Sequence, residues 1–182
     1  RNTTSYIPVP QRINGNGDLG SSTIVKKIYV GRCYHGYPSV WLLDNQGRVY
    51  SWGYNQYGQL GDNTGADRNV PAAVDQNGVL SGRIVTAISS GDAHHLALCS
   101  DGTLATWGWN YSGQLGLGDT TARLTATVVP RTGAISGKTI ASIHGGDVFC
   151  RLHCTDGSTA TSGDNTEGGL GINSSSTTSR SS

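Results

Sequence analysis

A stretch rich in aromatic residues and glycine occurs twice in this chain, at an interval of 55 residues. The first copy, WGYNQYGQLG, occupies residues 52–61, and the second, WGWNYSGQLG, occupies residues 107–116. A third and degenerate copy, SGDNTEGGLG, follows at residues 162–171. Self-similarity at a fixed period is the signature of a repeat architecture. We therefore expect the chain to fold as a series of equivalent units.

Each unit carries the signals of four short strands joined by tight turns. Before the second copy, the runs IVTAIS and HLALCS are β-branched or alternating, and an Asp-Gly turn leads from them to TLATWG. Asp-Gly between two such runs is a strong hairpin signal. A fourth apolar run, ATVV, follows at residues 126–129. Four short strands in each unit, without helical periodicity, predict an all-β propeller in which each unit is one blade.

The period predicts a single repeat domain of about three four-stranded blades. We expect a partial blade at residues 1–30, blades at 31–90 and 91–145, and an incomplete blade at 146–182. The C-terminal TSRSS has no apolar residues, so the last blade is expected to lack its own fourth strand, which YIPVP of another copy could supply. Three blades would leave two open apolar faces. We therefore expect a homo-oligomer or a larger assembly to complete the ring, and the absence of Met together with Arg1 at the start indicates a piece of a longer protein.

The composition excludes several classes of protein. The net charge of +1 does not provide the basic face that nucleic-acid binding normally requires. No apolar run reaches the roughly 18 residues of a membrane span. Glycine is abundant, at 27 of 182 residues, about twice its usual frequency of roughly 7%. That excess fits a fold made mostly of turns and short strands.

The repeat resembles a known family. In order, it contains Gly, His-x-x-Ala-Leu, Asp-Gly, Trp-Gly-x-Asn, Gly-Gln-Leu-Gly and Pro, and this order is similar to the repeat of the regulator of chromosome condensation family. The match is close over residues 91–130, carries an insertion around CYHGYPSVW in residues 31–71, and weakens in the third copy, where Ser162 replaces Trp. The resemblance implies propeller blades of this length, with Trp52 and Trp107 packed between neighbouring blades.

The positions that vary between copies are rich in rings and are the candidate binding residues. Loops on a rigid scaffold often carry function, and Tyr and Trp dominate binding hot spots. For each ring, the alternative that it fills a gap between blades stays open. The candidate ligand-binding residues are Tyr34, Tyr37, Trp41, Tyr54, Tyr57, Trp109 and Tyr111.

No motif indicates catalysis, a cofactor or a metal ion. GNGDLG at residues 15–20 has the form GxGxxG, but a strand-like run follows where a dinucleotide site needs a helix. His94 and His95 are adjacent, so on a strand they face opposite sides and do not share an ion easily. The four cysteines, at positions 33, 99, 150 and 154, form no CxxC pair. Small buried residues are the favoured interpretation of these cysteines, and a disulfide stays open.

We therefore predict a non-catalytic interaction module that recognises a protein or a glycan. The expected setting is an extracellular, cell-surface or virion protein, such as a phage tail fibre or a secreted bacterial protein. Two alternatives stay open. One is a purely structural spacer or decoration subunit. The other is the guanine-nucleotide exchange activity of the family's founding member, which would require a complete seven-bladed ring and a basic tail.

Overall fold

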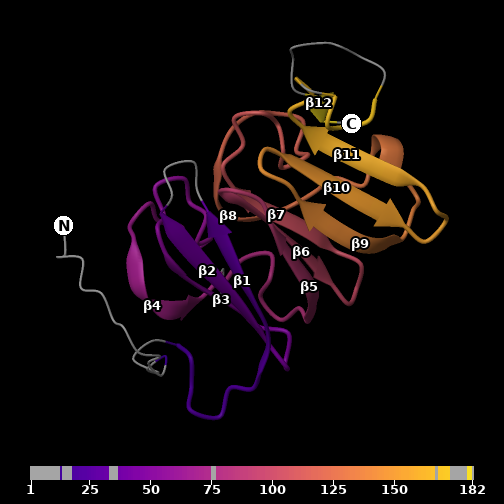
Figure 1. Cartoon of the computed structure of the whole chain (residues 1–182). Coiled ribbons are helices and arrows are strands. Elements are labelled where there is room, and N and C mark those ends of the chain that lie inside the picture. The colour runs from indigo at the N-terminus through magenta and orange to yellow at the C-terminus, as the bar shows by residue number, and fades with distance from the viewer. Residues whose placement is uncertain are drawn as a thin grey trace.

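The computed structural model describes residues 13, 18–32, 37–74, 77–166, 168–172 and 180–181. These residues form three separate four-stranded antiparallel sheets, one for each blade (Figure 1). The prediction of an all-β propeller with about three four-stranded blades is confirmed. Within the described ranges, helical structure is confined to a 3-10 turn, η1 (Gly133–Ile135). No helix in this part of the chain is long and apolar enough to cross a membrane.

The strands of each blade follow one another in sequence order across the sheet. Blade 1 contains β1 (Val25–Arg32), β2 (Pro38–Asp44), β3 (Val49–Gly53) and β4 (Arg68–Ala73). Blade 2 contains β5 (Val85–Ser90), β6 (His94–Cys99), β7 (Leu104–Gly108) and β8 (Arg123–Val128). Blade 3 contains β9 (Ile140–Gly145), β10 (Phe149–Cys154), β11 (Thr159–Gly163) and β12 (Arg180–Ser181).

The blade limits differ from those expected from the sequence. The expected boundaries near Val30, Ser90 and Gly145 fall inside β1, β5 and β9, which open the three sheets instead of closing the preceding ones. A repeat period fixes the phase of the units but not the strand at which a unit begins.

The third blade also has a fourth strand of its own. Ser181 lies opposite Ser162 and Arg180 lies opposite Gly163 in the pairing of β12 with β11. The prediction that this blade lacks its own fourth strand was wrong, because pairing at a sheet edge uses backbone groups and does not require apolar side chains. The YIPVP segment lies outside the described residues.

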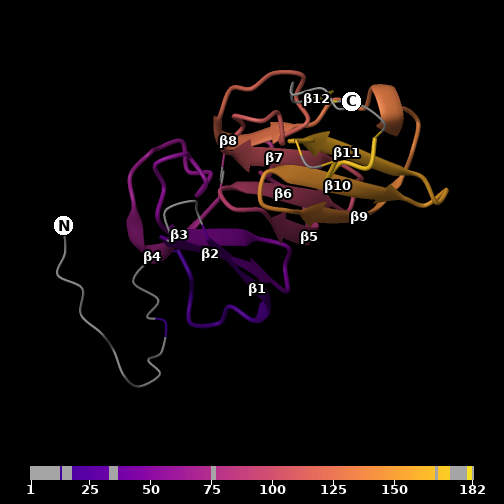
Figure 2. The same cartoon turned by 45° about the horizontal axis from the view of Figure 1, so that its top comes forward.

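The first strands of the three blades lie side by side, and β5 contacts both β1 and β9 (Figure 2). Close approach of these strands requires glycine. A Cβ atom on Gly91 would clash with the carbonyl oxygen of Gly146 and with the ring of His94. Glycine at position 91 therefore lets the end of β5 approach the end of β9.

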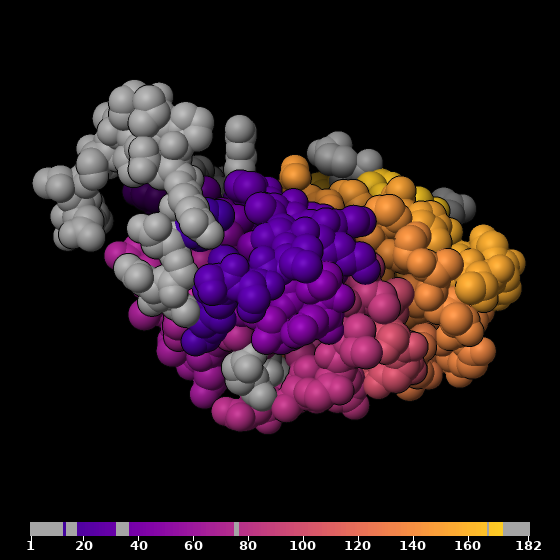
Figure 3. Space-filling model, turned by 90° about the horizontal axis from the view of Figure 1, so that it is seen from below, coloured from indigo at the N-terminus to yellow at the C-terminus, as the bar shows by residue number. Residues whose placement is uncertain are grey.

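Two apolar cores lie between the blades. The cluster between blades 1 and 2 includes Trp41, Leu60 and Trp107, each at most 1% exposed. The cluster between blades 2 and 3 is built from aliphatic residues and cysteines, with Leu152 and Ile135 among them. Seen from below, the blades succeed one another across the surface from indigo to yellow (Figure 3).

A buried asparagine organises the repeated turn in each blade. The amide nitrogen of Leu60 donates to Asn55 Oδ1 at 2.9 Å. The same bond joins Leu115 to Asn110 at 2.9 Å and Leu170 to Asn165 at 3.1 Å. These bonds replace the ladder pairing that the chain gives up when it reverses direction.

Candidate functional site

Five of the predicted binding residues form one continuous line of rings, here called the aromatic row: Tyr37, Tyr54, Tyr57, Trp109 and Tyr111. Ring centroids are 5.2 Å apart for Tyr37 and Tyr54, and 6.3 Å apart for Tyr54 and Tyr57. The line crosses to blade 2 at 5.8 Å between Tyr57 and Trp109, and continues at 6.4 Å to Tyr111. Residues from three separate loops thus share one surface.

The repeated turn places these rings. Tyr54 and Tyr57 lie in the β3–β4 loop and Trp109 and Tyr111 in the β7–β8 loop, while Tyr37 directly precedes β2. Antiparallel pairing brings the start of β2 beside the end of β3. Each loop leaves its strand at a glycine with positive φ, 106° at Gly53 and 94° at Gly108. Neighbouring blades therefore present equivalent loops at the same edge.

The aromatic row is partly open to solvent. Tyr37 is 55% exposed and Tyr111 is 78% exposed, while the three rings between them are half-buried. Tyr57, Ala93, Trp109 and Tyr111 line a hollow of about 260 Å³. The hollow has the size of a site for one apolar side chain of a partner.

The aromatic row ends at blade 2. The residues 55 positions after Trp109 and Tyr111 are Asp164 and Thr166, whose side chains bond to each other within their own turn. The third blade has the same turn without the rings. This difference supports the view that the turn is structural and that the rings are an addition to it.

The prediction that Trp41 is a ligand-binding residue was wrong. Its side chain is 1% exposed, it stacks on His95 with ring centroids 3.7 Å apart, and its Nε1 donates to the carbonyl of Gln59 at 3.3 Å. A ring buried between two blades cannot contact a ligand at the surface. Tyr34, the remaining candidate, lies outside the described residues.

Of the two repeat tryptophans expected to pack between blades, Trp107 does so in this structure, whereas Trp52 packs within its own blade. Trp107 is fully buried and its Nε1 donates to Gln59 O, a residue of blade 1, at 3.0 Å. Trp52 occupies the equivalent position in blade 1 and packs against the cluster of Leu19, Leu42 and Tyr50 on the outer face of that blade. The Trp52 side chain is therefore only partly buried, whereas that of Trp107 is fully buried.

The two adjacent histidines are held neutral by burial, and Asp62 is paired within the chain. Burial lowers the pKa of His94 to about 4 and holds the pKa of His95 well below its usual value. Asp62 Oδ2 pairs with Arg68 Nε. Across the described residues, no group of three or more His, Cys, Asp or Glu side chains is placed to hold a metal ion.

The cysteines that the structure describes are buried free thiols. Cys99, Cys150 and Cys154 form no disulfide, and burial raises the pKa of the Cys99 thiol to about 11. Cys33 lies outside the described residues. These three cysteines occupy core positions, which agrees with the favoured interpretation of small buried residues.

Comparison with known proteins identifies the repeat. The family model of the regulator of chromosome condensation (RCC1) repeat matches residues 46–98 and 101–150, and a second model of this repeat matches residues 85–114. The chain belongs to the RCC1 repeat family. The resemblance inferred from the sequence motifs is confirmed.

The relatives are longer proteins. The Arabidopsis thaliana ultraviolet-B receptor UVR8 is 33% identical over 111 residues, which cover 61% of this chain and 22% of UVR8. The human probable E3 ubiquitin-protein ligase HERC6 is 33% identical over 145 residues, or 80% of this chain and 14% of HERC6. This chain therefore spans less than a quarter of either relative.

A solved structure shares the fold. In the crystal structure of Kap60 bound to yeast RCC1 (Prp20), the matched chain superimposes with a TM-score of 0.64 at 24% identity. The match covers 80% of this chain and 31% of that chain. The three blades of this protein therefore correspond to part of a longer propeller chain.

Proposed function

We propose that this RCC1-repeat propeller is a non-catalytic module that binds a protein segment through the aromatic row. The observation that carries the proposal is the unbroken line of rings from Tyr37 to Tyr111 across two blades. Such a line exposes more aromatic surface than the turn needs, because blade 3 builds the turn without any ring. Exposed aromatic clusters of this kind mark interaction sites.

The chemistry of the aromatic row favours an uncharged peptide segment. Tyr and Trp offer apolar ring surface and a polar edge at little conformational cost. In the pairs Tyr37–Tyr54 and Trp109–Tyr111 the rings are stacked, with interplanar angles of 21° and 19°. Stacking leaves ring edges to face the partner. An apolar side chain of the partner would enter the hollow beside Trp109.

Related propellers support a protein partner. The yeast RCC1 structure is a complex with Kap60, and a further structure of Prp20p from Saccharomyces cerevisiae is titled for its binding to Gsp1p and histones. Glycan recognition, the other partner class predicted from the sequence, becomes an outcome of the test. The extracellular, cell-surface or virion setting remains part of the proposal.

The test is a selection on the whole chain with a displayed peptide library, run beside a glycan array. We expect peptides with an aromatic or aliphatic anchor to be selected, and Tyr111→Ala and Trp109→Ala each to weaken their binding about 30-fold, the effect of a hot-spot ring. Thr166→Ala, at the equivalent position of blade 3, is the matched control and should change binding less than about twofold. Peptide binding unaffected by both ring variants, or selection of glycans alone, would contradict the proposal.

We also propose that further blades pack on the outer face of blade 1, in a homo-oligomer or a larger assembly. Trp52 lies on this face among Leu19, Leu42 and Tyr50, whereas the equivalent Trp107 is covered by the neighbouring blade. Light scattering of the chain should show an assembly larger than the 19.0 kDa chain mass. A stable monomer with a cooperative melt would contradict this proposal and leave the aromatic row untouched.

A further inference from the structure

The two interfaces between blades are built from different side chains at equivalent positions. Between blades 1 and 2, His95 lies opposite Trp107 in the pairing of β6 with β7, and both rings are buried. Between blades 2 and 3, the residues 55 positions later are Cys150 and Ser162, which lie opposite each other in β10 and β11. An imidazole and an indole are thus replaced by two small side chains.

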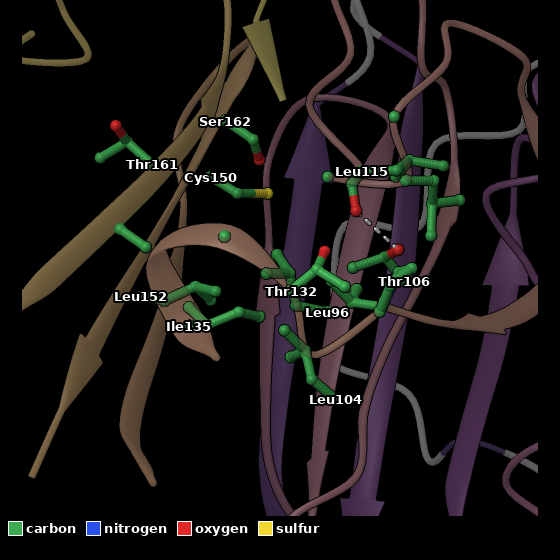
Figure 4. Close-up of a pocket in the computed structure, with 17 residues that line it drawn as sticks. Leu96, Leu104, Thr106, Leu115, Thr132, Ile135, Cys150, Leu152, Thr161 and Ser162 are labelled. Atoms are coloured by element: carbon green, nitrogen blue, oxygen red, sulfur yellow. Dashed lines mark hydrogen bonds between the residues drawn. The ribbon is translucent and has the colours of Figure 1, made fainter. Parts of the chain in front are cut away.

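The lost volume is not refilled. A cavity of about 250 Å³ lies between blades 2 and 3, and its wall is mainly aliphatic. Figure 4 shows Cys150 and Ser162 pointing from blade 3 across this space toward Leu96 and Thr106 of blade 2. An apolar cavity of roughly 150 Å³ is large enough to hold benzene. The space here is therefore sufficient for a larger flat ring system.

The polar side chain at the wall is Ser162, and its hydrogen bond has an equivalent in the other interface. Trp107 Nε1 donates to the carbonyl of Gln59 at 3.0 Å, and Ser162 Oγ donates to the carbonyl of Gln114 at 3.0 Å. Gln59 and Gln114 are 55 residues apart. The carbonyl of Gln114 thus occupies the position that the carbonyl of Gln59 has in the other interface. It accepts from the Ser162 hydroxyl instead of from an indole N–H group.

We propose that the cavity between blades 2 and 3 binds a small, flat aromatic molecule that carries an N–H group and has the size of indole. The aliphatic wall takes the ring, as the neighbouring interface takes the ring of Trp107. The N–H group of the molecule donates to the hydroxyl oxygen of Ser162, which lines the cavity. That oxygen keeps lone pairs to accept a hydrogen bond while its own proton goes to the buried carbonyl of Gln114. The site shares no residue with the aromatic row, so this inference is independent of the proposed function.

The test is binding of indole to the whole chain, followed by two-dimensional NMR and by calorimetry. We expect saturable binding with a Kd of roughly 0.1–1 mM, as for a small fragment in a preformed pocket, and shifts confined to residues of the two facing blades. Indene has the same shape without the N–H group and should bind roughly fivefold more weakly, the effect of one hydrogen bond.

Variants of the cavity separate this site from other sites. Ser162→Trp restores the repeat residue and should abolish indole binding while raising the melting temperature. Cys150→Phe fills the same space from the opposite strand and should also abolish binding, so the test remains decisive if either variant fails to fold. Ser162→Ala removes the hydroxyl that accepts the N–H group and should weaken indole binding roughly fivefold, to the level of indene.

Tyr111→Ala removes a ring from the aromatic row and is the control for indole bound in its hollow. Unchanged indole binding in this variant supports the cavity between blades 2 and 3 as the binding site. Loss of binding in Tyr111→Ala, binding that persists in both filled variants, or no binding of indole at millimolar concentration would each overturn the proposal.

Discussion

Replacement of Asn110 by Ala tests whether the asparagine of the repeated turn holds the blade together. The Asn110 side chain is fully buried. Its Oδ1 accepts from the amide of Leu115 at 2.9 Å, and its Nδ2 donates to the carbonyls of Asp119 at 2.9 Å and Thr121 at 3.0 Å. One side chain therefore closes the turn at Leu115 and ties it to the loop that leads into β8.

The cost follows from these three bonds. The amide of Leu115 is buried and would lose its partner, at a cost of about 1–3 kcal/mol. The two carbonyls lie in exposed residues, where water can replace the lost donor, so each bond accounts for about 0.5–1.5 kcal/mol. The total is about 4 kcal/mol, which corresponds to a fall in melting temperature of roughly 8–16 °C for a chain of this size.

Thermal melts followed by circular dichroism measure this effect. Tyr111→Ala is the matched control, because it removes a larger side chain from the next position, which is 78% exposed. The control should melt within about 2 °C of the parent, as expected for an exposed surface substitution. The reasoning is refuted if Asn110→Ala melts as high as the parent, or if Tyr111→Ala melts as low as Asn110→Ala.

Two further predictions concern stability. His94 has a folded-state pKa of about 4, below its usual 6.5, so only the unfolded chain binds a proton between these values. The contribution of neutral His94 to the free energy of unfolding is complete above about pH 6.5 and falls by about 3 kcal/mol as the pH drops to 4. An equal melting temperature at pH 5 and pH 7.5 would contradict this. Gly91→Ala should lower the melting temperature by more than about 6 °C, because the new Cβ would clash with Gly146 O. Gly169→Ala, with nothing within 4 Å of the new Cβ, should have little effect, and equal melts of these two variants would contradict the steric argument.

The aromatic row shows which part of the site could be predicted from the sequence. The variable positions after each Trp-Gly identified Tyr54, Tyr57, Trp109 and Tyr111, because a repeat makes the non-repeating residues conspicuous. Their order in space could not be predicted. Tyr57 meets Trp109 across two blades, a contact that depends on how the sheets stack. The prediction that Trp41 binds a ligand was wrong for the same reason. Its position beside the insertion suggested a loop, but the residue lies in β2 and its ring packs on His95 of the next blade.

The sequence by itself determined the repeating unit: the 55-residue period, the run of short strands in each repeat, the Asp-Gly hairpins and the recurring Asn55, Asn110 and Asn165. These features are set by hydrogen bonds and backbone conformations among residues close in the chain, so they can be predicted from the sequence of each repeat alone. Tertiary structure decided what lies between the copies. The indole of Trp107 fills a space closed by Gln59, 48 residues away. The change to Ser162, visible in the sequence, leaves a cavity that no other described side chain of blades 2 and 3 fills. Packing between units depends on pairs of distant side chains, and a periodic sequence does not specify how such pairs fit.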